Sequence, residues 1–192
     1  GKSIQGIRHQ MVLATKVAMA MGEGPNTRGA SRKHILEQVE RSLTKLGTDF
    51  IDLYQLHESD PITPIEETMR TLDDLVRQGK VRYIGCSNFA AWEVARAMET
   101  ACALNLEPFI SVQPAYNLLG REPEEELLPC CGAYGLGILP YYPLAEGFLT
   151  GKYGRGQPPS DGTRLAGKPD SAQALLTAHN FALLERLEQF AS

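Results

Sequence analysis

The sequence has no long apolar run, no cluster of basic residues and no apolar amino-terminal leader. A membrane-spanning helix needs about 20 mostly apolar residues, so no membrane partner is expected. A net charge of -4 without a basic cluster argues against a nucleic-acid surface. Residues 1–6 lack the hydrophobic region of a signal peptide. Together these absences predict a cytoplasmic protein.

Cysteine motifs for metal or redox chemistry are also missing. The four cysteines are Cys86, Cys102, Cys130 and Cys131, and none forms a CxxC pair. A disulfide between the adjacent Cys130 and Cys131 would be strained. We therefore expect reduced, buried thiols and no metal site.

Short apolar segments alternate with helical patterns along most of the chain. The predicted strands are near 11–17, 50–57, 81–88, 109–113 and 136–142, and the predicted helices between them are near 31–46, 64–78, 91–103 and 124–134. This alternation is typical of an α/β protein with a parallel sheet. Both an eight-stranded (β/α)8 TIM barrel and a doubly wound sheet would fit it.

The missing glycine-rich phosphate loop helps to choose between these two folds. Neither GxGxxG nor GxxxxGK[ST] occurs in the sequence, although a doubly wound sheet often carries such a turn after its first strand. Polar residues follow several predicted strands instead. We predict one domain over residues 1–192, an incomplete barrel with about five of its eight parallel strands recognisable.

Local signals set some of the expected boundaries. Ser31 is a candidate N-cap and Gly47 a candidate C-cap of the first helix. The inward face of the third helix is predicted to contain Trp92, Ala95, Met98 and Cys102. Residues 154–170 are rich in Gly, Pro and Ser and predict a mobile loop, and residues 175–190 predict a last amphipathic helix.

Lys16 and His57 stand at the carboxyl ends of two neighbouring predicted strands. Chemistry in parallel sheets is concentrated at that edge, so two titratable groups there indicate an enzyme. By position alone, the favoured interpretation of Lys16 is a side chain that reaches solvent, and that of His57 is a satisfied core residue. Asp52 is predicted to point to the opposite face of its strand and to be structural.

Five segments of the sequence resemble the aldo-keto reductase family, in the branch of bacterial general reductases and potassium-channel β subunits. The matching segments are 12–17, 49–57, 79–89, 112–117, and 141–145 followed by 151–153. The resemblance implies a barrel that binds NADP(H) and an oxidoreductase that reduces small aldehydes or ketones to alcohols by hydride transfer. It also implies a central piece of a longer protein, whose catalytic aspartate and tyrosine precede Gly1.

The resemblance implies that Lys16 and His57 are catalytic. Lys16 would lower the pKa of the tyrosine proton donor, and His57 would hydrogen-bond the substrate carbonyl. Ser87, Asn88 and Gln113 would hold the nicotinamide carboxamide, because their side chains match its donors and acceptor. For each of these residues, turn chemistry or ordinary burial is the structural alternative.

The remaining implied residues contact the rest of the cofactor. Tyr141 would stack on the nicotinamide ring, and Lys152 and Arg164 would face the phosphates. Tyr142 stands where the family has a serine, which would alter cofactor binding. Glu146 is expected to face solvent. The residues implied to lie along the pyrophosphate of the cofactor are Tyr142, Pro143, Leu144, Gly147, Lys152 and Arg164.

Two other functions stay open at the level of sequence. The chain could belong to a non-catalytic, cofactor-sensing regulatory subunit, or it could be an inactive truncated reductase. We expect residues 1–192 alone to show no turnover of NADPH with 4-nitrobenzaldehyde. Unpaired edges of an incomplete barrel would also favour association with another chain, including a homo-oligomer.

Overall fold

The structure is a computed structural model that describes residues 1–191. The chain divides into two compact units. The first unit contains Gly1–Pro114 and Glu124–Leu139, and the second contains Ala115–Pro123 and the chain from Pro140 onward. Each unit has its own apolar core, so each is described by itself.

The first unit is a parallel five-stranded sheet with its strands in sequence order, β1-β2-β3-β4-β5. The strands are β1 (Ala14–Val17), β2 (Ile51–Leu56), β3 (Val81–Ser87), β4 (Phe109–Gln113) and β5 (Gly137–Ile138). The helices are α1 (Arg32–Leu46), α2 (Ile65–Arg77), α3 (Ala91–Leu104) and α4 (Leu127–Tyr134), with short 3-10 turns at Lys2–Ile4 and Arg8–Gln10. A further 3-10 turn, Glu122–Glu124, begins in the second unit. The predicted α/β class is confirmed.

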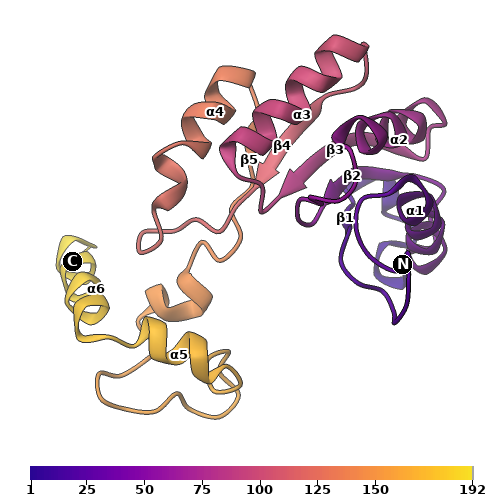
Figure 1. Cartoon of the computed structure of the whole chain (residues 1–192). Coiled ribbons are helices and arrows are strands. Elements are labelled where there is room, and N and C mark those ends of the chain that lie inside the picture. The colour runs from indigo at the N-terminus through magenta and orange to yellow at the C-terminus, as the bar shows by residue number, and fades with distance from the viewer. Residues whose placement is uncertain (192) are drawn as a thin grey trace. The chain divides into compact units, whose positions relative to one another are not determined.

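The strand order also bears on the barrel prediction. Right-handed crossovers that always advance in the same direction leave every helix on one face of the sheet, and helices α1 to α4 lie on one side of it in Figure 1. A doubly wound sheet would reverse its order and carry helices on both faces. The observed arrangement is therefore consistent with part of a barrel.

The core of the first unit lies between this sheet and its helices. Tyr54 and Leu56 of β2, Cys86 of β3 and Val112 of β4 are buried in it. Because side chains alternate along a strand, the neighbouring positions lie on the other, helix-free face, here called the inner face. The inner face carries Lys16, Leu53, Gln55, Gly85, Ser87, Ser111 and Gln113.

The caps of α1 follow the sequence prediction. The Ser31 hydroxyl accepts a hydrogen bond from the His34 N–H at 3.4 Å, and Gly47 adopts the left-handed conformation with φ 63°. A hydroxyl that accepts from the first turn satisfies one of the free amides of a helix. A glycine at the other end adopts positive φ without steric cost.

The predicted inward face of α3 is partly wrong. Val94, Ala97 and Ala101 are the buried residues of this helix, whereas Trp92 is 63% exposed and Cys102 is exposed. The small alanines let the helix approach the sheet closely, which turns the bulkier residues outward. The four cysteines are free thiols, but the exposure of Cys102 also corrects the expectation that all four are buried.

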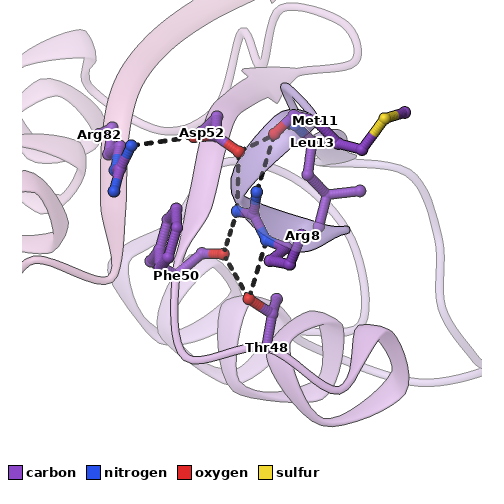
Figure 2. A network of polar contacts seen from close by, with 7 residues as sticks. All are labelled: Arg8, Met11, Leu13, Thr48, Phe50, Asp52 and Arg82. Atoms are coloured by element: carbon purple, nitrogen blue, oxygen red, sulfur yellow. Dashed lines mark hydrogen bonds and ion pairs between the residues drawn. The ribbon is translucent and has the colours of Figure 1, made fainter. Parts of the chain in front are cut away.

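Asp52 is structural, as predicted, and lies at the centre of a polar network at the amino-terminal end of the sheet (Figure 2). Its carboxylate pairs with Arg8 at 2.7 Å and Arg82 at 3.4 Å, and it accepts from the Leu13 N–H at 2.9 Å. The ring of Phe50 lies between the two guanidinium groups, each 4.0 Å from its centroid. This network joins the segment before β1 to β2 and β3.

The second unit is built from short helices and loops. It contains the 3-10 segment η4 (Ala145–Thr150) and the helices α5 (Pro169–Leu175) and α6 (Ala178–Ala191). Its core includes Phe148 and Phe181, whose rings pack edge to face at 5.2 Å.

No helix among residues 1–191 is long and apolar enough to cross a lipid bilayer.

Several predicted boundaries toward the end of the chain need correction. Helix α5 begins at Pro169, inside the predicted loop, because proline suits the first helical turn. A second helix begins after Thr177, whose hydroxyl accepts from the Asn180 N–H at 3.2 Å. Helix α4 begins at Leu127 rather than near 124. The ladder of β5 covers only Gly137–Ile138 of the predicted 136–142.

Candidate active site

The first unit brings five of the predicted site residues to one edge of its sheet. Lys16 lies near the end of β1, His57 directly follows β2, Ser87 ends β3 with Asn88 next to it, and Gln113 ends β4. Ser87 and Gln113 are register partners across β3 and β4. The carboxyl ends of parallel strands meet at one edge, which is why residues so distant in the chain converge here.

Hydrogen bonds fix the backbone around His57. Its N–H donates to the Val17 carbonyl at 2.7 Å, and its carbonyl accepts from the Asn88 side-chain amide at 2.9 Å. Asn88 itself has φ 55°, a left-handed conformation that asparagine tolerates better than most residues. The Ser87 hydroxyl donates to the Gln113 carbonyl at 2.7 Å. These bonds tie the ends of four strands together.

The charge state of His57 depends on its surroundings. Burial lowers the pKa of His57, the positive charge of Lys16 lowers it further, and Glu58 opposes both effects. The imidazole is therefore neutral near neutral pH and carries one N–H donor. A neutral imidazole beside an ammonium group can donate a hydrogen bond to a carbonyl oxygen.

The inner face contains polar atoms that the described residues do not satisfy. Gln113 Oε1, Gln55 Nε2 and Ser111 Oγ are buried and have no hydrogen-bond partner among residues 1–191. An unpaired buried polar group costs free energy, so this face suits polar partners. Gln113 Oε1 is an acceptor, and the carboxamide N–H of nicotinamide is a donor that fits it.

In the second unit, Tyr142 occupies a strained turn. Its φ is 55°, an uncommon value for a bulky residue, and its ring packs edge to face with Tyr141 at 5.1 Å. The Asn117 amide holds the Tyr142 carbonyl at 3.1 Å. Asn117 therefore helps to fix the backbone of Tyr142, a contact that no local sequence pattern indicates.

Glu146 does not face solvent, contrary to the prediction. Its side chain is only 10% exposed, and its Oε2 pairs with Lys168 Nζ at 2.6 Å and with Arg164 Nε at 3.3 Å. Both cations also lie beside the Tyr142 ring, at 4.8 Å for Arg164 and 5.2 Å for Lys168. Burial alone would raise the pKa of Glu146, but Lys168, Ser171 and Arg164 lower it. Lys168 is not recognisable as a site residue from the sequence. Its only signal there is a positive charge close to Arg164 in the chain.

The turn predicted to contact the pyrophosphate is tightly folded. Ala145, Glu146 and Gly147 all have positive φ, and the amides of Ala145 and Gly147 donate to the carbonyls of Tyr142 and Leu144. Those two amides are thus engaged within the turn, and Pro143, which lies between Tyr142 and Leu144, has no N–H. Lys152 Nζ lies over this turn, since a Cβ at Gly147 would sit 2.8 Å from it.

No group of three or more histidine, cysteine, aspartate or glutamate residues within positions 1–191 is arranged to hold a metal ion.

Comparison with known proteins defines the class of this chain. The model of the aldo/keto reductase family matches residues 1–192. The chain belongs to this family, and the resemblance noted from its motifs is confirmed.

Three relatives show the range of similar proteins. A probable voltage-gated potassium channel subunit beta from Oryza sativa subsp. japonica is 41% identical over 155 residues, which is 80% of this chain and 47% of the relative. Aldo-keto reductase YhdN from Bacillus subtilis is 44% identical over 79% of this chain and 45% of its own length. A putative aryl-alcohol dehydrogenase, AAD16, from Saccharomyces cerevisiae is 49% identical over 65% and 36%. The chain thus spans about half, or less, of the length of these relatives.

Proposed function

We propose that this chain contributes to an NADP(H)-dependent oxidoreductase that reduces small aldehydes or ketones to alcohols. The observation that carries the proposal is the placement of Lys16 and His57 at the carboxyl edge of the sheet, where the Lys16 charge helps to keep the imidazole neutral. Membership of the aldo/keto reductase family supports the same reaction class.

His57 and Lys16 would have different tasks in this reaction. The neutral imidazole of His57 donates its N–H to the substrate carbonyl oxygen and stabilises the negative charge that develops there. The Lys16 ammonium lowers the pKa of a tyrosine proton donor supplied by the whole protein. Protonation of the oxygen by a positioned acid completes the reduction.

The cofactor, when bound, supplies the hydride. Gln113 Oε1 would accept from the nicotinamide carboxamide, and Ser87 and Asn88 would fix the orientation of that group. The unpaired, buried state of Gln113 Oε1 supports this role. Tyr141 would stack on the ring, and Tyr142, Pro143, Leu144 and Gly147 would line the path of the phosphates.

The phosphates would meet cations of the second unit. Lys152 and Arg164 are the proposed contacts, and the position of Lys152 Nζ over the Gly147 turn supports the first. Arg164 is paired with Glu146, so it would exchange that carboxylate for a phosphate when the cofactor binds.

A second function is favoured by the similarity to potassium-channel β subunits from rice and other organisms. In that case the protein would bind the cofactor and report its redox state to a partner, with little or no turnover. Binding of NADPH without consumption would be the signature of this function.

The test uses the full-length protein that carries this sequence, with NADPH and 4-nitrobenzaldehyde. We expect turnover that falls about 100-fold or more in His57→Ala and Lys16→Met, in line with the loss of a positioned acid–base group. Arg70→Gln, at an exposed position of α2, is the matched control and should retain the rate. Gln113→Leu should raise the KM for NADPH more than it lowers kcat.

The outcomes separate the two functions. Turnover that is insensitive to His57→Ala would refute the catalytic assignment. Tight NADPH binding without turnover in the unmodified protein would favour the regulatory subunit. Residues 1–192 alone should give no turnover, and clear activity of this chain would contradict the role proposed for a tyrosine outside it.

A further inference from the structure

A cavity of about 430 Å³ lies in the first unit. It is bounded by the loop after β2 and by the first turns of α2 and α3. Leu56 and Phe89, which belong to the core between the sheet and the helices, form part of its wall. Lys16, His57, Ser87, Asn88 and Gln113 do not line it, although Ser59 and Phe89 follow His57 and Asn88 closely in the chain.

The walls of this cavity are largely apolar. Pro61, Ile62, Pro64 and Trp92 contribute to them, and two of these side chains are left open to solvent, with Ile62 90% and Trp92 63% exposed. Large exposed apolar side chains around a concave surface are typical of a ligand or partner site. A volume of this size suits a small organic molecule.

The carboxylates at the cavity are already engaged. Asp60 accepts from the Ala30 N–H at 2.7 Å, from the Ile62 N–H at 2.9 Å and from the Thr63 hydroxyl at 2.7 Å. Glu93 accepts from the Ala90 N–H at 2.8 Å at the start of α3. These bonds give both carboxylates a structural role in holding the loop and the helix end.

Arg96 differs from these two residues. It lines the same cavity from the second turn of α3, and residues 1–191 supply it with no ion pair or hydrogen bond. It is therefore the charged group of the cavity that is available to a ligand. A guanidinium group binds a carboxylate through two parallel hydrogen bonds.

We propose that this cavity binds an organic monocarboxylate, with Arg96 pairing with its carboxylate and with Trp92 and Ile62 covering its apolar body. The lining shares no residue with the proposed nicotinamide site, so the proposal does not depend on that site. A neutral or cationic molecule of the same shape would fill the apolar walls but would leave Arg96 without a counter-ion.

Trp92 provides the readout, because it is the single tryptophan of the chain. Octanoate is titrated into the 192-residue chain while tryptophan fluorescence is followed, and octanol and octylamine serve as neutral and cationic probes of the same length. We expect saturable quenching or a spectral shift with octanoate at concentrations at least about tenfold lower than with the other two.

Variants at Arg96 test the charge pairing. Arg96→Gln should weaken octanoate binding about tenfold or more without affecting octanol, whereas Arg96→Lys should retain part of the affinity. Arg70 is an exposed arginine of α2 that does not line the cavity. Arg70→Gln should therefore leave octanoate binding unchanged. Far-ultraviolet circular dichroism of each variant checks that the fold is retained.

Each outcome decides the proposal. No fluorescence change with octanoate, equal responses to octanoate and octanol, or undiminished binding in Arg96→Gln would overturn it. NADPH has no part in this titration, so the result is independent of whether the protein is a reductase.

Discussion

Lys16 and His57 lie at the carboxyl ends of adjacent parallel strands, and the ammonium group of Lys16 lowers the pKa of the His57 imidazole. The shift adds to the larger effect of burial, and Glu58 acts in the opposite direction. The native state therefore binds a proton at His57 less readily than the unfolded chain does. The stability linked to this shift is present above the ordinary histidine pKa and is lost as the pH falls through the lower, native value.

Substitution of the two charged neighbours should move the His57 pKa in opposite directions. Lys16→Met removes a positive charge and should raise the pKa toward its ordinary value, although burial will keep it below that value. Glu58→Gln removes the opposing negative charge and should lower the pKa further. Titration of the histidine ring protons by NMR measures both. A shift in the same direction in both variants would contradict this account.

Asp52→Asn should destabilise the first unit. Burial by itself would raise the pKa of Asp52, but the Leu13 amide, Arg8 and Arg82 lower it below its usual value. Loss of the negative charge leaves Arg8, whose side chain is 19% exposed, without its ion-pair partner. We expect a loss of about 2–3 kcal/mol in unfolding free energy, because removal of one member of a largely buried pair is costly. Urea denaturation near neutral pH measures it.

The control for Asp52→Asn is Asp74→Asn. Asp74 pairs with Arg32 at 2.6 Å, but both side chains are at least 40% exposed. The free energy of unfolding should therefore fall by no more than about 1 kcal/mol in Asp74→Asn. The pH dependence gives a second check. The stability that ionised Asp52 contributes should be present above the pKa of Asp52 in the unfolded chain. It should disappear as the pH falls through the lower pKa of Asp52 in the native state. Equal losses in the two variants would argue against a special role for the network.

Gly85→Ala should disturb the sheet beneath the candidate site. A Cβ at this position would lie 2.7 Å from the Ser111 hydroxyl and 2.8 Å from the Ser111 carbonyl oxygen, so β3 and β4 would have to move apart. We expect the free energy of unfolding to fall by about 1–3 kcal/mol, as for other overpacked sites. Thermal unfolding of Gly85→Ala and Gly132→Ala provides the comparison. A Cβ at Gly132 in α4 meets nothing within 4 Å, so that change should be neutral or stabilising.

Glu146→Gln should destabilise the second unit more than Glu185→Gln does. Glu146 holds both Lys168 and Arg164 with a side chain that is only 10% exposed. Glu185 pairs with Arg155 with both side chains more than half exposed, where an ion pair contributes little. The expected result is a larger fall in Tm for Glu146→Gln. Because the lowered pKa of Glu146 keeps it ionised, the difference should shrink as the pH falls through that pKa.

Much of the first unit could be read from the sequence. The four longer strands and the helices α1 to α3 follow from apolar periodicity, and the caps of α1 follow from Ser31 and Gly47. The edge that carries Lys16, His57 and Gln113 also follows, because residues at the carboxyl ends of parallel strands must meet. The functional roles of these residues stay predictions.

Other features depended on contacts between distant segments. Periodicity placed Trp92 inside, but the alanines of α3 set how closely the helix packs. The charge of Glu146 suggested exposure, but Lys168 lies 22 residues away in the sequence and pairs with it. No local rule joins Arg8 to Asp52, which are brought together only when β2 forms beside the amino-terminal segment.

The α/β class, the family and the edge of the sheet at which the polar residues gather can all be predicted from the amino-acid sequence, because strand ends and motif spacing are local properties of the chain. The neutral state favoured for His57, the unpaired buried Gln113 Oε1 and the cavity with its available Arg96 arise only in the folded protein. These depend on burial and on which charges become neighbours, and both are fixed only when segments far apart in the chain pack together.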